Sequence, residues 1–505
     1  MHITKILLDL KPALDGYAGI PQESRLLFRG LRALADYDIE GLIQHGGKVL
    51  RPASPAKGKL LSTSRRIHQH SRMIVSLFEK SDENSLEKVV QNIHTYLAPL
   101  LIELRKVSCI PITLSHFESD YFDDFIWQTL FSKTLQPEDK KLISQACYRI
   151  IKQSRKQLHR AGLDGLKFFS NPWYVSINTK GFDFFLAQTP FPGKVSSETI
   201  MVVRYHDSVP MFMPHTINDK VFHESSHFYA LQENVRAGAY FSCISESTRH
   251  DLLKIFPEAE PRTSVIHNMV STDYFDEATS KGLVGVIIRN RISRDKELVS
   301  NLKCLNADFD SNQSCDFTYL LMVSTIEPRK NHLLLVSAWE RLKYTTMPNL
   351  KLVVVGNYGW DQGPVIDAFR PWAKRGDIFH LTNVPLHELR ALYKHAVATI
   401  CPSIAEGFDY SGIEAMLSGG ITIASDIPVH REIFQNAADY FNPHSADDAA
   451  MVIQRVIAND GEAIRKQLRE YGHKTANLYT PDKILPKWHD FFQGLKASRG
   501  KVSYN

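Results

Sequence analysis

Two carboxylates, Glu406 and Glu414, stand eight residues apart on either side of a glycine turn. Residues 398–403 predict a short buried strand before this turn, and residues 414–420 predict a helix that ends at glycines. Ligands of α/β proteins gather at such turns from strand to helix. The free N–H groups of a helix start favour an anion, and a carboxylate accepts hydrogen bonds from sugar hydroxyls. A sugar linked to a nucleoside diphosphate offers both groups.

A structural role is the alternative for each carboxylate. Ser411 and Glu414 have the S-x-x-E spacing of a capping box, in which the glutamate only closes the first turn of a helix. Glu406 could be an ordinary acid of a loop. The motif alone leaves these interpretations open.

A basic pair, Arg329 and Lys330, lies between a predicted strand at 318–323 and a predicted helix at 331–342. A guanidinium and an ammonium at this turn could neutralise a leaving diphosphate. A solvated basic pair is the alternative, but positive charge beside a helix start is slightly unfavourable. We therefore expect a functional reason for the pair, and we place both residues in catalysis.

The first half of the chain offers a glycine loop and one histidine. Gly16 and Gly19 lie between a predicted strand at 3–10 and a predicted helix at 22–34, without the G-x-G-x-x-G spacing of a dinucleotide fingerprint. They allow a ligand to approach the backbone, or they form only a turn. His206 follows a predicted strand at 200–205 in a His-Asp-x-x-Pro context. A single histidine in this place is often structural, but the context favours a functional role.

Length and composition indicate a globular protein of several domains. The chain has 505 residues, of which 43% are hydrophobic and 23% charged, so we expect two or three domains. No apolar run approaches the roughly 18 to 20 residues of a membrane span, and the N-terminus lacks signal-peptide features. We expect a cytoplasmic protein. Six cysteines without C-x-x-C spacing argue against a zinc cage or a disulfide framework.

The positive charge is unevenly distributed. A net charge of +5 is too small to indicate nucleic acid as a partner, but residues 41–78 contain no acid and seven lysines or arginines. This segment is either a solvated basic face or a contact for an anionic membrane surface or a phosphate-bearing acceptor.

Strands and helices alternate in both halves, which predicts an α/β protein with doubly wound parallel sheets. Further strands are expected in the first half at 182–187, 239–244 and 262–266, and in the second half at 350–355, 378–381, 421–424 and 439–441. Residues from about 50 to 165 are expected to form a helical basic insertion, with a clear amphipathic stretch at 85–97.

The predicted domain boundaries follow a polar linker. Residues 289–316 separate an N-terminal domain at 1–300 from a second domain at 317–480, and a terminal helix at 481–505 could pack back on the first domain. Asp308 and Asp310 form a D-x-D in the linker, which we interpret as a solvated loop and not a metal site.

Taken together, several motifs resemble the retaining glycosyltransferases of family 4, also called glycosyltransferase group 1. The second half matches in order and spacing, through the segments 324–331, 356–360, 406–414 and 424–432. The first half matches less closely, through the segments 16–19, 204–210, 244–252 and 265–269, and residues from about 50 to 165 are not covered.

This resemblance implies a GT-B architecture, in which two Rossmann-like domains face each other across a cleft. The second domain would bind the donor and the first the acceptor. Glu406 would hold hydroxyls of the donor sugar, Glu414 those of the ribose, and His206 would orient the acceptor and the transferred sugar. Many relatives have an arginine where this chain has Thr325, which leaves Arg329 as its substitute.

A second departure concerns residues 406–411, which we call the donor loop. Many relatives have Gly-Leu-Pro where this chain has Asp409, Tyr410 and Ser411. The carboxylate of Asp409 would repel a diphosphate unless it turned away or met a sugar hydroxyl. We therefore expect the backbone N–H groups from Phe408 to Ser411, and not the side chains, to contact the donor.

The resulting hypothesis is transfer of a hexose, with retention, from a nucleotide diphosphate sugar to a glycan or lipid-linked acceptor in surface polysaccharide synthesis. Arg329 and Lys330 would take up the diphosphate charge, so we expect no cofactor and no metal requirement. Resemblance to bacterial polysaccharide mannosyltransferases makes GDP-mannose the first choice of donor, and the inner face of the membrane a place for the enzyme. A sugar-nucleotide epimerase and a non-catalytic carbohydrate-binding scaffold are the alternatives.

Overall fold

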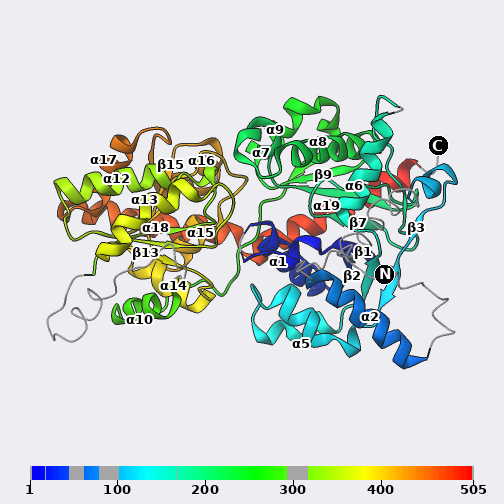
Figure 1. Cartoon of the computed structure of the whole chain (residues 1–505), viewed down its shortest axis with the longest axis horizontal. Coiled ribbons are helices and arrows are strands. Elements are labelled where there is room, and N and C mark those ends of the chain that lie inside the picture. The colour runs from blue at the N-terminus through cyan, green and yellow to red at the C-terminus, as the bar shows by residue number, and fades with distance from the viewer. Residues whose placement is uncertain are drawn as a thin grey trace, which may run out of the picture. The chain divides into compact units, whose positions relative to one another are not determined.

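The computed structural model describes residues 3–17, 19–44, 62–78, 102–167, 169–292 and 317–502. The chain divides into two compact units, whose elements Figure 1 traces from blue to red. Unit 1 comprises Met1–Met211, Asp219–Cys243 and Arg249–Val265, and unit 2 comprises Phe212–Asn218, Ile244–Thr248 and Ile266–Asn505. Each unit contains one large, mostly parallel β-sheet.

In the described part of unit 1, eight strands form a sheet in the order β10-β9-β8-β7-β1-β2-β5-β4. Neighbouring strands are parallel except β4 and β5, which pair antiparallel. The strands are β1 (Thr4–Asp9), β2 (Tyr37–Gln44), β4 (Ser115–Phe117), β5 (Tyr148–Ile151), β7 (Phe184–Ala187), β8 (Ile200–Tyr205), β9 (Tyr240–Cys243) and β10 (Thr263–Val265). A separate parallel pair consists of β3 (Ile112–Thr113) and β6 (Ile177–Asn178).

Helices of unit 1 cover this sheet. Side chains of α6, α8 and α9 pack with alternate residues of β7 and β8 in one buried cluster. The helices and turns are η1 (Lys11–Leu14), α1 (Ile20–Arg32), α2 (Thr63–Phe78), η3 (Ser119–Tyr121), α4 (Asp123–Phe125), the π-helical turn η4 (Ile126–Phe131), η5 (Pro137–Asp139), α5 (Lys140–Ser144), α6 (Arg155–Asp164), η6 (Gly165–Lys167), α7 (Val209–Phe212), α8 (Lys220–Arg236), α9 (Glu246–Ile255) and η8 (Pro257–Arg262). The last residues of α7 and the first of α9 belong to unit 2.

The expected helical insertion is only partly helical. α2 confirms helix in its first part, but β4 and β5 lie inside the segment 50–165 and extend the central sheet beside β2. The expectation of a wholly helical segment is therefore wrong. Tyr148 holds β5 against the rest of unit 1. Its ring is fully buried and stacks on Phe28 of α1, with the ring centroids 5.9 Å apart.

Unit 2 contains a six-stranded parallel sheet in the order β13-β12-β11-β14-β15-β16. Continuous apolar runs predicted all six strands, because a strand that is covered on both faces needs no polar side. The strands are β11 (Tyr319–Val323), β12 (Lys351–Val355), β13 (Ile378–Leu381), β14 (Ala398–Cys401), β15 (Thr422–Ser425) and β16 (Ala438–Phe441).

The helices of unit 2 cover both faces of this sheet (Figure 1). α12, α13 and α17 share one buried cluster with alternate strand residues, and α10, α14, α15 and α16 share the other. The helices and turns are η7 (Pro214–Thr216), α10 (Gly282–Arg291), η9 (Pro328–Lys330), α12 (His332–Thr345), α13 (Gly363–Arg375), α14 (Leu386–His395), α15 (Tyr410–Leu417), α16 (Pro428–Phe434), η10 (Gln435–Ala437), α17 (Ala446–Ile457), η11 (Asn459–Gly461), α18 (Glu462–Ala476), η12 (Asn477–Tyr479) and α19 (Pro481–Val502).

The strand order of unit 2 reverses between β11 and β14. β12 and β13 follow β11 on one side, and β15 and β16 follow β14 on the other. The loops that leave β11 and β14 therefore run to opposite sides of the sheet and open a crevice at its carboxyl edge, where ligands of doubly wound proteins bind. In unit 1 the order reverses between β1 and β7.

Several sequence-based expectations concern residues outside the described ranges. The amphipathic stretch 85–97, Asp308, Asp310 and most of the linker lie there, as do residues 45–61 of the basic segment.

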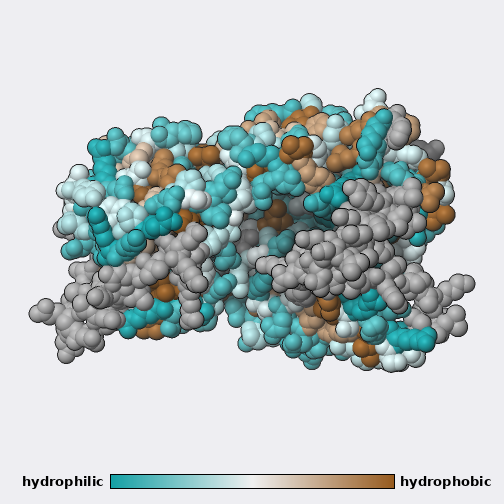
Figure 2. Space-filling model, viewed as in Figure 1, coloured by the Kyte–Doolittle hydropathy of each residue, from teal (hydrophilic) through white to brown (hydrophobic). Residues whose placement is uncertain are grey.

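On the face shown in Figure 2, hydrophobic residues lie singly or in small groups among hydrophilic ones. Among the described helices, none combines the length and the apolar character that a membrane crossing requires.

Candidate functional site

The loops that follow β11, β12 and β14 are tied together at the carboxyl edge of the sheet in unit 2. Gly356, after β12, lies so close to the β11 loop that a Cβ atom would stand 1.9 Å from the carbonyl oxygen of Ser324. Asn331 has a left-handed backbone, with φ 61°, and its Nδ2 donates to the carbonyl oxygens of Pro402 at 3.1 Å and Pro443 at 2.9 Å. These contacts fix η9, which carries the basic pair.

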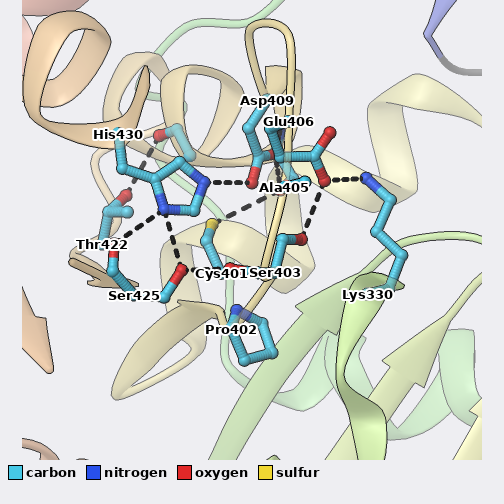
Figure 3. Close-up of polar contacts among 12 residues, drawn as sticks. Lys330, Cys401, Pro402, Ser403, Ala405, Glu406, Asp409, Thr422, Ser425 and His430 are labelled. Carbon is cyan, nitrogen blue, oxygen red and sulfur yellow. Dashed lines mark hydrogen bonds and ion pairs between the residues drawn. The ribbon is translucent and has the colours of Figure 1, made fainter. Parts of the chain in front are cut away.

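Glu406 pairs with both cations of the η9 turn, and Figure 3 shows its contact with Lys330. Arg329 donates from Nη1 to Oε2 of Glu406 at 2.7 Å and to the carbonyl oxygen of Ala405 at 3.1 Å. Lys330 Nζ donates to the other carboxylate oxygen, Oε1, which also accepts from Ser403 Oγ at 2.8 Å. The structure thus brings together three of the residues that the sequence placed in catalysis.

The charge of Glu406 is maintained by this network. Burial disfavours the charged form of its carboxyl, but the nearby charges of Arg329 and Lys330 outweigh this effect and lower its pKa. The Glu406 side chain is 6% exposed, against 20% for Arg329 and 15% for Lys330. Arg329 also pairs from Nε with Glu327 at 2.8 Å, so two partly accessible cations lie between two buried carboxylates.

The helix after this loop begins at Tyr410, four residues before the predicted start. Asp409 is its N-cap and accepts from the backbone N–H of Ser411 at 3.2 Å and from Ser411 Oγ at 2.7 Å. The capping-box interpretation of Ser411 and Glu414 is therefore wrong. Aspartate is a favoured N-cap because its short carboxylate reaches the free N–H groups of the first turn.

Asp409 turns its side chain away from the loop surface. Its Oδ2 lies 3.2 Å from Nε2 of His430, a fully buried residue of α16. Burial raises the pKa of the Asp409 carboxyl, but the hydrogen bond from His430 and the charge of Lys330 lower it well below its usual range. Sequence reasoning did not identify His430, since no local spacing connects it with the donor loop.

The rings of the donor loop lie in the core, and its backbone stays open. Phe408 and Tyr410 are buried and pack 5.2 Å apart between their ring centroids. Among the described residues, none accepts a hydrogen bond from the backbone N–H groups of Gly407, Phe408 or Asp409. The loop therefore offers N–H groups, and not side chains, to a ligand.

Glu414 lies one helical turn further on, and its carboxylate is held by tyrosines. Its Oε2 accepts from the hydroxyl of Tyr393 at 3.1 Å. Burial raises the pKa of Tyr274 well above its usual value, and the charge and hydrogen bond of Glu414 raise it further. Glu414 is 4% exposed, so its proposed contact with a ribose depends on one edge of the carboxylate.

Thr325 and Glu432 complete the polar surroundings in unit 2. Thr325 packs in the β11 loop, where its Cγ2 would stand 3.0 Å from a Cβ atom on Gly359. Glu432, in α16, accepts from the backbone N–H groups of Glu246 at 2.7 Å and Ser247 at 3.1 Å, and it pairs with His267 at 2.9 Å. This connects the motifs 244–252, 265–269 and 424–432 of the predicted resemblance.

The candidate residues of unit 1 lie at the carboxyl ends of its strands. His206 directly follows β8, and its Nε2 has no partner among the described residues. Burial, followed by the charge of Arg204, lowers the pKa of His206 to about 3, so its imidazole is neutral at pH 7. Gly19 has φ 71° at the start of α1 and needs to be glycine, whereas a side chain on Gly16 would meet nothing within 4 Å.

Comparison with known proteins relates the chain to a family of enzymes. Residues 306–475 match the family described as Glycosyl transferases group 1. The chain is 33% identical over 139 residues to the serotype-specific mannosyltransferase WbdA of Escherichia coli, covering 27% of this chain and 17% of WbdA. It is 26% identical over 251 residues to the O-antigen chain mannosyltransferase RfbU of Salmonella typhimurium, covering 49% of this chain and 57% of RfbU. The matches thus span less than two thirds of either relative.

The fold extends over the whole chain. The sucrose-phosphate synthase of Thermosynechococcus elongatus superimposes with a TM-score of 0.57 over 98% of this chain and 100% of its own, at 14% identity. The protein therefore has the GT-B glycosyltransferase fold, as the sequence predicted. Residues 306–475, which match the group 1 family, include β11 and β14, between which the strand order reverses.

Proposed function

We propose that this protein transfers a hexose from a nucleotide diphosphate sugar to a glycan hydroxyl in surface polysaccharide synthesis. The observation that carries the proposal is the network of Arg329, Lys330 and Glu406 at the strand-order reversal of a group 1 domain. The names of WbdA and RfbU support a mannosyl donor, and GDP-mannose is the first choice.

In the proposed reaction, the bond between the anomeric carbon and the diphosphate oxygen breaks as the acceptor hydroxyl forms the new glycosidic bond. Negative charge grows on the departing diphosphate. Arg329 and Lys330 stabilise that charge together with the open N–H groups of Gly407 and Phe408. Because the cations and N–H groups are in place beforehand, little reorganisation is needed in the transition state. The acceptor proton leaves with the nucleoside diphosphate product, so the charges balance.

Glu406 has a second task in this proposal. Its carboxylate holds the two cations apart from each other while the site is empty, and hydroxyls of the donor sugar share its oxygens when the donor binds. The diphosphate then takes over part of the pairing with Arg329 and Lys330. Glu414 would receive the ribose hydroxyls. Neutral His206 would donate or accept a hydrogen bond without adding charge, which suits contact with sugar hydroxyls.

Retention of configuration and independence from metal ions are further parts of the proposal. Both are tested with purified protein, GDP-mannose and a manno-oligosaccharide acceptor. We expect transfer to continue in excess chelator, an α-linked product by NMR, and a loss of activity of about 10²- to 10³-fold for Lys330→Ala. Lys343→Ala is the matched control. It changes a lysine of α12 that pairs with Asp377. Strict dependence on an added divalent cation would overturn the metal-independent mechanism.

Two arms of the same assay separate the rival activities. Incubation with donor alone, followed by analysis of the sugar nucleotide, tests for an epimerase, which would turn over donor without acceptor. Replacement of GDP-mannose by UDP-, ADP- and dTDP-sugars tests the choice of donor. A Glu406→Ala variant that retains full function in cells would favour a non-catalytic scaffold instead.

Membrane contact remains a proposal about the basic segment 41–78. Its described helix, α2, carries Arg65, Arg66 and Arg72, and Arg66 pairs with Glu118 at 2.9 Å. We expect the protein to sediment with vesicles that contain anionic lipid more than with neutral vesicles, and less so as salt increases. Equal sedimentation with both would contradict this contact.

A further inference from the structure

A closed set of hydrogen bonds surrounds the start of the donor loop (Figure 3). Ser403 Oγ donates to Glu406, and the Ser403 carbonyl oxygen accepts from Ser425 Oγ. Nδ1 of His430 lies 2.9 Å from the Ser425 carbonyl oxygen and 3.1 Å from Ser425 Oγ. The other ring nitrogen of His430 reaches Asp409. The loop from 403 to 411 is thus held at both ends from β15 and α16.

The partners of His430 are hydrogen-bond acceptors on both sides of the ring. The Oγ proton of Ser425 is used on the Ser403 carbonyl, so Ser425 presents only acceptor atoms to Nδ1. The carboxylate of Asp409 presents an acceptor to Nε2. A hydrogen on Nε2 donates to the Asp409 carboxylate, and this is the contact that reaches the donor loop.

The backbone of Asp409 shows that the loop needs this partner. Asp409 has φ 67°, a left-handed conformation that residues other than glycine seldom adopt, and aspartate tolerates it better than most. Such conformations persist only where the surroundings hold them. Its carboxylate is fixed by three groups: the N–H and Oγ of Ser411, and Nε2 of His430.

We infer that His430 is a positioning residue of the donor site, which holds the Asp409 side chain from the side of α16. With this contact in place, the N–H groups of Gly407, Phe408 and Asp409 remain aligned toward a diphosphate. The carboxylate that would otherwise repel the diphosphate is turned toward His430 and Ser411. This inference rests on the proposed function, since it assigns the loop to a nucleoside diphosphate.

The packing of His430 supports a fixed ring. It is fully buried and stacks on Phe434 with the ring centroids 5.0 Å apart. Gly412 of α15 lets Phe434 approach, because a Cβ atom there would stand 2.4 Å from the ring. The ring of His430 can therefore neither rotate freely nor exchange its partners for water.

Two substitutions separate the contact with Asp409 from the contact with Ser425. His430→Gln places an amide nitrogen near the position of Nε2 and can still donate to Asp409. His430→Asn places it near Nδ1 and can serve only Ser425. His444→Asn, the same change at an exposed histidine of unit 2, is the control. Binding of GDP, UDP and GDP-mannose is measured by calorimetry on each folded variant, with retained secondary structure checked by circular dichroism.

We expect His430→Asn to weaken binding of the preferred nucleotide by about tenfold or more, as loss of a buried charged partner does. His430→Gln should stay within about threefold of the wild type. Asp409→Gly, which keeps the left-handed backbone but removes the carboxylate, should also weaken binding. In transfer assays the donor KM should rise more than kcat falls.

The outcomes separate this inference from the proposed function. Equal binding by the wild type, His430→Asn and His430→Gln would overturn the role of His430 and leave the donor site intact. Equal loss in both His430 variants would also overturn it, because the contact with Asp409 would then not matter. Absence of binding by the wild type to every nucleotide tested would overturn the donor site itself, and the inference with it.

Discussion

Arg329 donates from Nη1 to Oε2 of Glu406 at 2.7 Å, across the crevice between the loops of β11 and β14. Lys330 binds the other oxygen of the same carboxylate. Glu327 also pairs with Arg329, at 2.8 Å, but Glu406 contacts both of the cations that a diphosphate would also attract. Glu406 competes with the phosphate groups for Arg329 and Lys330 while it serves the sugar.

This competition predicts opposite effects of Glu406→Gln on binding and on turnover. Removal of the charge leaves Lys330 without its pair with Glu406 and leaves Arg329 with Glu327 as its carboxylate, so free GDP or UDP should bind several-fold more tightly. Transfer should fall by about 10²-fold or more, because the amide no longer accepts strongly from sugar hydroxyls or orders the two cations. Calorimetry and initial rates measure the two effects.

Asp426→Asn provides the matched control for Glu406→Gln. It removes a carboxylate that forms an exposed pair with Arg431 in the same unit, at 2.7 Å. We expect little change in either measurement, because exposed ion pairs contribute weakly. Weaker binding of the free nucleotide by Glu406→Gln would contradict the competition.

The sequence predicted the strands around the site more readily than the contacts within it. β11 to β16 are apolar runs between turn residues, so their boundaries follow from local pattern. β2 and β5 were not predicted, because their polar residues, among them Glu40 and Arg149, interrupt the apolar pattern. These two side chains pair with each other across adjacent strands, at 2.5 Å, a contact that no local pattern reveals.

The start of α15 shows the same limit at the site itself. Ser411 and Glu414 satisfied one capping pattern, while Asp409 satisfied another two residues earlier. The sequence did contain that second signal, since aspartate is a common N-cap. What decided between them is His430, 21 residues away, which holds the Asp409 side chain in place. The charge of Asp409 could therefore not be assigned from the motif alone.

The buried carboxylate of Asp409 predicts a dependence of stability on pH. Its pKa is lowered in the folded protein, so below the ordinary range of an unfolded aspartate, about 4, the unfolded chain binds more protons. Its contribution is present at neutral pH, starts to decline near pH 4 and is lost only as the pH falls through the lowered pKa of the folded protein. Asp409→Asn should therefore reduce the free energy of unfolding at pH 7 by about 1 to 3 kcal/mol, and by less at about pH 2.

Asp460→Asn, at an exposed carboxylate in unit 2, serves as the control for this pH series. Its curve should run parallel to that of the wild type. If the difference between Asp409→Asn and the wild type stayed constant from pH 7 to about pH 2, the Asp409 carboxylate would not be held in its charged form in the folded protein.

His206 predicts the absence of a titration near neutral pH. Burial lowers its pKa to about 3, so its imidazole should remain neutral from pH 8 to pH 5. The Cε1 proton resonance, assigned by its loss in His206→Gln, should not move over that range. Ordinary exposed histidines of the chain should shift and provide the internal reference. A midpoint for His206 near 6.5 would show that burial does not lower its pKa.

Gly412→Ala tests whether the stack beneath His430 needs a glycine. A Cβ atom would stand 2.4 Å from the Phe434 ring, which must move or tilt and would shift the stacked His430 ring with it. We expect a loss of about 1 to 3 kcal/mol in the free energy of unfolding and weaker binding of GDP or UDP. Gly363→Ala, at the first residue of α13 with no atom within 4 Å of the new Cβ, should be neutral or slightly stabilising. Unfolding curves measure the free energy of unfolding of both variants, and calorimetry measures their nucleotide binding. Nucleotide binding by Gly412→Ala equal to that of Gly363→Ala would mean that Phe434 can move without disturbing the pairing of His430 and Asp409.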